Sequence, residues 1–93
     1  MPYFALHCVD RPDGLQARLA ARDAHRAYIQ STGVTKLAGP LLDAQGEMAG
    51  SLLIIEVEDM AAAEAFGAGD PYRTSGVFER VDIHPFRLVL GSL

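Results

Sequence analysis

The chain has 93 residues, 49% of them hydrophobic, and its eight basic and twelve acidic side chains give a formal net charge of −4. This length and apolar content predict one folded domain over residues 1–93 and exclude a disordered chain. The negative charge repels phosphate backbones and anionic lipid surfaces, so we expect no nucleic acid and no membrane among the partners.

Cysteine usage and the apolar runs bear on the compartment. Cys8 is the one cysteine, so it has no partner for an internal disulfide. No N-terminal stretch has the basic and then apolar layout of a signal peptide, and the apolar run Leu52–Ile55 is far shorter than the ~20 residues of a membrane span. We therefore predict a cytoplasmic protein.

The first predicted element is a strand over residues 3–9. Phe4, Leu6 and Cys8 alternate on one of its faces, and His7 lies on the other. Both faces are largely apolar, which predicts that both are covered.

A helix is predicted from Leu15 to Ile29, with Gly33 suited to the left-handed conformation just past its end. A kink or restart near Arg22 is one option, because Asp23 suits a first helical turn. The residues available for the buried stripe are apolar: Leu15, Leu19, Ala24, Ala27 and Tyr28. The arginines interleave with aspartates, so we interpret them as a solvated helix face in preference to an anion-binding stripe: Arg11, Arg18, Arg22 and Arg26.

Two strands and a short loop follow. The strand over residues 34–42 contains Gly39 and Pro40, and a proline there indicates an edge position or a bulge. A polar loop leads to the strand over residues 48–57, whose continuous run Leu52–Ile55 predicts burial on both faces.

The last third of the chain predicts a helix, one helical turn and a final strand. Asp59 caps a helix that Gly67 and Gly69 end, and Asp70 is the N-cap of a single turn through Ser75. In the strand over residues 77–84, alternation separates two sets: Val77, Val81 and Ile83 on one face, and Phe78, Arg80, Asp82 and His84 on the other. A separate strand or edge segment is predicted at residues 86–90, after Pro85.

The order strand, helix, strand, strand, helix, strand is that of a ferredoxin-like βαββαβ fold of the α+β class with an antiparallel sheet. Both helices on one face of the sheet leave the other face bare. Because the strands are apolar on both faces, a second sheet is expected to cover the bare one, which predicts a homodimer.

Two segments carry a family resemblance. Arg22-Asp23-Ala24-His25 and the stretch Gly39–Tyr72 resemble the YCII-related (YciI-like) family, and the resemblance covers nearly the whole chain. It implies the dimeric α+β barrel architecture, in which two sheets close face to face. It also implies that His25 is the catalytic group and that Asp70 lies close to it as the second half of a His-Asp dyad.

The candidate catalytic residues also have structural interpretations. An imidazole transfers protons near neutral pH, which suits a catalytic role for His25. The alternative interpretation is that His25 is an exposed or capping histidine of the helix. Asp70 before Pro71 is an ordinary N-cap, and the two roles are compatible. A carboxylate beside the imidazole would orient the ring and stabilise its protonated form. Tyr72 either donates to a developing oxyanion or only packs its ring.

Further residues are assigned to substrate binding, and each has a plainer interpretation. Gly39 and Pro40 shape the chain beside the pocket, and Ser51 is a strand-end serine with no base beside it in the sequence. His7 belongs to the set if Phe4, Leu6 and Cys8 face the helices, because His7 then points into the interior of the barrel. A buried and fully hydrogen-bonded core histidine is its plainer interpretation. The full substrate-binding set is Tyr72, Ser51, His7, Gly39, Pro40 and Arg22.

Three functions remain open. The leading one is a cofactor-independent enzyme of isomerase or lyase type that acts on a small organic, aromatic or lactone-like molecule, as the resemblance implies. The second is a non-catalytic dimeric module that binds a small ligand or serves a structural role. The third, a haem-degrading or quinol-oxidising barrel, requires an axial ligand such as His25 or His7. The histidine and cysteine spacings support no metal site, and we predict no cofactor.

Overall fold

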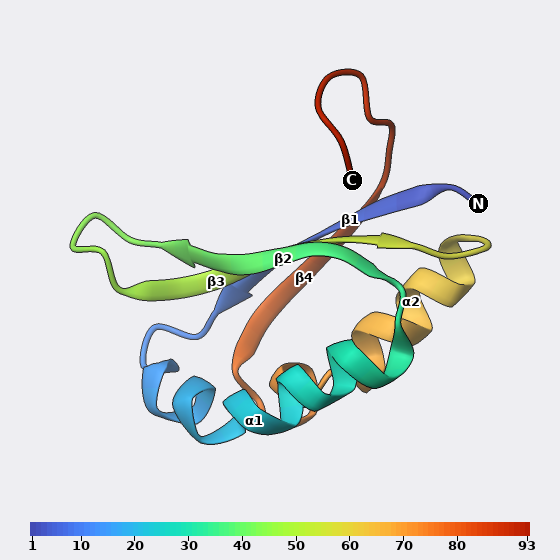
Figure 1. Ribbon diagram of the computed structural model, residues 1–93. Helices are drawn as coiled ribbons and strands as arrows, with labels where there is room; N and C mark the ends of the chain where they lie inside the picture. Colours follow the sequence, from blue (N-terminus) through green and yellow to red (C-terminus); the bar gives the residue numbers. More distant parts are fainter.

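Four antiparallel strands form one sheet in the order β2-β3-β1-β4 in the computed structural model, which describes residues 1–93 (Figure 1). The strands are β1 (Tyr3–Asp10), β2 (Thr35–Leu42), β3 (Met48–Glu56) and β4 (Phe78–Phe86). The helices are α1 (Leu15–Thr32), α2 (Met60–Gly69) and the single turn α3 (Pro71–Thr74). The α+β class and the ferredoxin-like order of elements are therefore confirmed.

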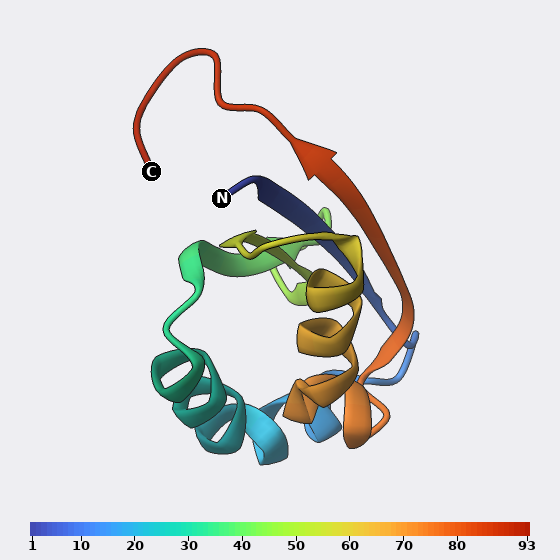
Figure 2. The same cartoon turned by 90° about the vertical axis from the view of Figure 1, so that its right-hand side faces the viewer.

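The helices cover one face of the sheet, and the core lies between the two layers (Figure 2). Leu6 of β1 is paired with Leu53 of β3 and with Ile83 of β4, so alternate residues of three strands point at the helices. The most deeply buried side chains include Leu6, Leu53, Ile55 and Val77. No helix combines the length and the hydropathy that crossing a lipid bilayer requires.

Helix α1 is continuous through Arg22, and Gly33 ends it in the left-handed conformation with φ of 68°. The predicted apolar stripe is confirmed at Tyr28, which packs against the core, and is wrong at three other positions. Leu19 is 50% exposed, and Ala24 and Ala27 are exposed as well. The side chains that face the sheet recur three or four positions apart, because that spacing defines one helical face: Arg18, Ala21, His25 and Tyr28.

The C-terminal region departs from the prediction in two ways. Strand β4 continues through Pro85, which an edge strand tolerates because one side of it has no ladder partner. Residues 87–90 form no strand, and Leu90 is 92% exposed. Phe78 was predicted on the polar face but is 5% exposed, because a register shift between Val9 and Asp10 pairs it with Asp10 and turns it into the core.

Pro40 lies on an edge strand, as predicted, since β2 pairs only with β3. The register irregularities of β2 fall between Thr35 and Leu37 and between Leu41 and Leu42, so the bulge alternative at Pro40 is wrong.

The second face of the sheet carries no helix. Ala5, His7 and Leu52 lie on it, and Leu37 of the edge strand is 43% exposed there. Residues 3–9 are thus covered by helices on one face only within a single chain.

Candidate functional site

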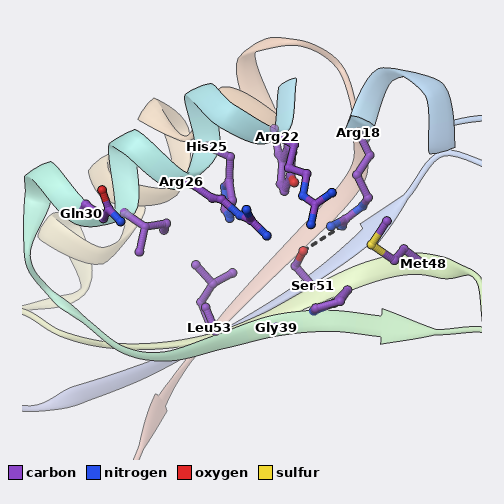
Figure 3. A pocket seen from close by; sticks show the side chains of 13 residues that line it. Arg18, Arg22, His25, Arg26, Gln30, Gly39, Met48, Ser51 and Leu53 are labelled. Atoms are coloured by element: carbon purple, nitrogen blue, oxygen red, sulfur yellow. Dashed lines mark hydrogen bonds between the residues drawn. The ribbon is translucent and has the colours of Figure 1, made fainter. Parts of the chain in front are cut away.

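A cavity of about 570 Å³ lies between helix α1 and the strands β2 and β3 (Figure 3). Its two walls differ in chemistry, because α1 supplies basic side chains whereas the strands supply mainly small and apolar ones. The 13 lining residues are Arg18, Arg22, His25, Arg26, Ile29, Gln30, Ala38, Gly39, Pro40, Met48, Ser51, Leu53 and Tyr72.

His25 and Asp70 meet beside this cavity. Nδ1 of His25 lies 2.8 Å from Oδ1 of Asp70, although 45 positions separate the two residues in the chain. A carboxylate only accepts hydrogen bonds, so Nδ1 carries the proton and donates it. The other ring nitrogen, Nε2, has no hydrogen-bond partner in the protein. The side chain of His25 is 13% exposed and that of Asp70 is 4% exposed, so water screens the contact only weakly.

The corner at Asp70 is built by local sequence. Its Oδ1 also accepts the backbone N–H of Tyr72 at 2.9 Å, which makes Asp70 the N-cap of α3, and Pro71 occupies the first helical position. The carboxylate is therefore held by its own backbone before it meets the imidazole. The capping role and the contact with His25 coexist in one side chain.

A contact one helical turn along α1 fixes the distance between the two helices. Tyr28, three residues after His25, donates its hydroxyl to the carbonyl of Phe66 at 2.8 Å. Gly69 leaves room for that hydroxyl, because a Cβ at this position would lie 2.6 Å from it. The absence of a side chain beside Asp70 thus allows α1 and α2 to approach closely enough for the His25 contact.

Tyr72 packs against both His25 and Arg18. Its ring stacks on the imidazole with centroids 3.9 Å apart and planes 10° from parallel, and Cζ of Arg18 lies 4.6 Å from its centroid. The ring is 4% exposed, and burial raises the pKa of the phenol above its ordinary value, with the charge of Asp70 acting in the same direction. The hydroxyl accordingly keeps its proton at neutral pH and is able to donate a hydrogen bond.

Arg18 corrects the prediction of a fully solvated arginine face. Its side chain is 3% exposed and forms a two-point ion pair with Asp10, Nε to Oδ2 at 2.8 Å and Nη2 to Oδ1 at 2.9 Å. Nη2 also donates to the carbonyl of Gly50 and to Oγ of Ser51, each at 2.8 Å. Burial lowers the pKa of Arg18, but the hydrogen bond and charge of Asp10 outweigh it and hold the pKa above its ordinary value. This guanidinium is a permanent, paired charge.

The remaining predicted residues divide between the two faces of the sheet. Gly39 and Pro40 line the cavity wall opposite α1, and so does Ser51, whose hydroxyl is bonded to Arg18 and to no base. Phe4, Leu6 and Cys8 face the helices, as the assignment of His7 required. His7 therefore lies on the other face of β1, where it is exposed. His7 therefore does not join His25 in this cavity. No three side chains of the His, Cys, Asp or Glu type converge in a way that could hold a metal ion.

Asp10, Arg18 and Arg26 were not singled out as site residues. The signal for the arginines was present, since Arg18, Arg22 and His25 share one helical face at spacings of four and three, and Arg26 follows Arg22 by one turn. Asp10 ends the first strand and gave no comparable signal. Its role depends on Arg18 reaching back to it across the loop.

Similarity to known proteins agrees with this architecture. Protein YciI of Escherichia coli O6:H1 is 36% identical over 95 residues, which cover 92% of this chain and 97% of that protein. An uncharacterised protein of Haemophilus influenzae is 32% identical, with 94% of this chain and 98% of that protein covered.

One solved structure is also closely similar. It is the 5-chloro-2-hydroxyhydroquinone dehydrochlorinase (TftG) of Burkholderia phenoliruptrix in complex with 2,5-dihydroxybenzoquinone. It superposes with a TM-score of 0.84 at 30% identity, over 91% of this chain and 93% of that one. The YCII-related domain itself matches residues 2–87. On this match and these identities, the chain belongs to the YCII-related family.

Proposed function

We propose that this protein is a cofactor-independent enzyme of isomerase or lyase type, in which His25 and Asp70 perform acid/base chemistry on a small organic molecule of aromatic or lactone-like kind. The observation that carries the proposal is the contact between Nδ1 of His25 and Oδ1 of Asp70 at 2.8 Å beside a cavity. Asp70 holds the ring with Nδ1 protonated, which leaves the lone pair of Nε2 available to accept a proton.

In the proposed reaction, Nε2 of His25 removes a proton from a carbon of the substrate. The C–H bond breaks, the proton passes to Nε2, and the carboxylate of Asp70 stabilises the imidazolium that results. For an isomerase, the electron pair forms a new double bond and the imidazolium returns the proton to a different atom. For a lyase, the same electron pair forms a double bond and expels a leaving group such as chloride. Tyr72 would donate its hydroxyl to an oxygen that gains negative charge.

The similarity to TftG supports this choice of reaction type. That protein is named as a dehydrochlorinase of a chlorinated hydroxyhydroquinone, and its structure contains a dihydroxybenzoquinone. The elimination of chloride and a proton is a lyase reaction. The first substrate class to test is therefore a hydroxylated aromatic molecule that can lose a proton from one of its carbon atoms.

We also propose that the protein is a homodimer that covers the bare face of the sheet with a second copy. Leu37 and Leu52 belong to the apolar part of this face, which carries no helix in the single chain, and Leu37 is 43% exposed. A small domain gains the most from such burial, because folding alone removes a limited share of its surface from water. Light scattering during gel filtration should report twice the chain mass, and a double variant, Leu37→Lys with Leu52→Lys, should shift it to a monomer.

Proton exchange tests the catalytic proposal even where the product is unidentified. Hydroxyhydroquinones, 5-chloro-2-hydroxyhydroquinone and an unsaturated lactone are incubated with the protein in heavy water, and loss of C–H signals is followed by NMR. We expect enzyme-dependent exchange or chloride release, reduced about 100-fold or more in His25→Asn. His84→Asn, which changes a histidine outside the cavity on the second face of the sheet, is the matched control and should retain full exchange and the mass of the wild-type protein.

The same assay distinguishes the proposed enzyme from the non-catalytic module that only binds a small ligand. Exchange by wild-type protein that His25→Asn does not alter would contradict a role for this imidazole. If no substrate of the panel exchanges and His25→Asn binds the panel as tightly as wild type does, the chain is better described as a small-ligand-binding module.

A further inference from the structure

We propose that the cavity takes its ligand as an anion, a small organic carboxylate or phenolate whose charged oxygen is held by the guanidinium groups of Arg22 and Arg26. The inference rests on the proposed function only in making this anion the substrate of His25. It adds the charge of the substrate and two residues that recognise it.

Two arginines flank His25 along α1. Arg22 precedes His25 by three residues and Arg26 follows it by one, so all three project from neighbouring positions on one side of the helix. Figure 3 shows both arginines extending from α1 into the space between the helix and strands β2 and β3. Both line the cavity together with the imidazole.

These two arginines have no counter-charge. No aspartate or glutamate lines the cavity, and neither Arg22 nor Arg26 has a carboxylate within 4.0 Å. The charge of Arg18, the third arginine of the wall, is already paired with the carboxylate of Asp10. Arg22 and Arg26 are one helical turn apart, so their like charges repel each other. The cavity thus gathers positive charge although the chain as a whole has a net charge of −4. Both side chains are exposed, so water solvates them in the free protein and their guanidinium groups are available to a ligand that enters the cavity.

The two walls of the cavity define the shape of the ligand. A guanidinium offers planar, paired N–H donors that match a carboxylate or a phenolate oxygen. Across the cavity lie the apolar side chains of Leu53, Pro40 and Met48. A ligand with a charged end and an apolar body fits these two walls, and its body then lies beside His25. Negative charge that develops on such a substrate during proton removal would be stabilised by the same arginines.

The test compares anions with neutral molecules of the same shape. Benzoate is paired with benzamide, and 4-nitrophenolate with 4-nitroanisole, and binding to isotope-labelled protein is measured by NMR titration. We expect at least one anion to bind about tenfold more tightly than its neutral counterpart, and the preference to shrink as salt is raised. The anion that shows the preference identifies a carboxylate or a phenolate as the natural group. If neither anion is preferred by the wild-type protein, the inference is wrong.

Substitutions assign the preference to the two arginines. Arg22→Gln with Arg26→Gln should abolish the difference between anion and neutral counterpart, whereas Arg11→Gln should retain it. Arg11 is exposed and lies outside the cavity, so this control removes one positive charge without touching the wall. An anion preference that survives in the double variant would show that the arginines are merely solvated and would overturn the proposal.

The outcome is separable from that of the proposed function. Anion binding that is intact in His25→Asn, together with no proton exchange by wild type, would leave the anion site standing and the enzyme proposal refuted. Proton exchange that is equally fast in wild type and in the double arginine variant would leave the enzyme proposal standing and refute the anion site.

Discussion

The ring of Tyr72 lies parallel to the imidazole of His25, with centroids 3.9 Å apart and an angle of 10° between their planes. Tyr72 follows Asp70 by two residues, and its backbone N–H binds the same carboxylate oxygen that His25 binds. One turn of chain thus contacts the imidazole twice, through the edge at Nδ1 and through the face of the ring.

The stacking and the hydroxyl of Tyr72 can be tested separately. Tyr72→Phe retains an aromatic ring over the imidazole, whereas Tyr72→Leu removes it. We expect the upfield ring-current shift of the His25 ring protons to persist in the first variant and to disappear in the second, as followed by NMR. Tyr3→Leu, remote from the cavity, is the control and should leave these signals unchanged. If proton exchange is lost in Tyr72→Phe while the shift persists, the hydroxyl acts as the oxyanion donor. Identical shifts in the Phe and Leu variants would contradict the stacked geometry.

The contact with Asp70 should set the tautomer of His25. Asp70→Ser keeps an N-cap oxygen, so α3 is preserved, but the shorter side chain no longer reaches the imidazole. We expect nitrogen NMR at a pH where the ring is neutral to show the Nδ1–H form in wild type and a shift toward the Nε2–H form in the variant. Asp59→Ser makes the same change at the cap of α2 and should not alter His25. A wild-type ring in the Nε2–H form would refute the assignment.

The ion pair between Asp10 and Arg18 should matter most when only one partner is removed. Arg18→Met leaves the buried carboxylate of Asp10 without its counter-charge, which we expect to lower the free energy of unfolding by about 3–5 kcal/mol. Combining Arg18→Met with Asp10→Leu removes both charges and should recover most of that loss. Urea unfolding of the two variants measures the difference. A double variant no more stable than Arg18→Met would mean that the contacts of Arg18 with Gly50 and Ser51 dominate.

Cys8 should make the protein less stable in alkaline solution. Burial raises the pKa of its thiol from 9.0 to about 12, with the charge of Asp70 as a smaller cause in the same direction. Because the unfolded chain releases this proton first, the contribution is intact below pH 9.0 and is lost as the pH rises toward about 12. Between about pH 8 and about pH 10.5, wild type should lose about 2 kcal/mol more unfolding free energy than Cys8→Ala.

Urea unfolding at the two pH values provides the comparison for Cys8. Burial also raises the pKa of Tyr28 and of Tyr72, but both tyrosines are present in wild type and variant and therefore cancel. Equal losses in the two proteins would show that the thiol ionises as readily in the folded chain as in the unfolded one.

Local sequence determined most of the secondary structure. The alternation of Phe4, Leu6 and Cys8 predicted β1 and its buried face, Asp59 predicted the start of α2, and Gly33 the end of α1. These features depend on the backbone preferences of a residue and its near neighbours, so they can be read without the fold. The turn at Asp70 and Pro71 was predictable for the same reason.

Burial along α1 was decided by tertiary structure. Small and apolar residues occur on several sides of this helix, so its sequence does not mark one stripe as the core-facing one. Arg18 is buried because Asp10, at the end of β1, and Ser51, on β3, complete its hydrogen bonds. Hydropathy alone assigns an arginine to solvent, since the partners that compensate for its burial are distant in the chain.

The arrangement of the site was likewise decided by tertiary structure. The sequence by itself determined the capping turn that orients the carboxylate of Asp70 and the helix that carries His25. Only the packing of α1 against α2, with the hydroxyl of Tyr28 over Gly69, brings those two side chains to 2.8 Å across 45 residues. The sheet likewise separates His7 from His25, because neighbouring positions of a strand point to opposite faces and only one face carries helices. Capping is a local interaction, whereas the proximity of two side chains requires every element between them to be in place.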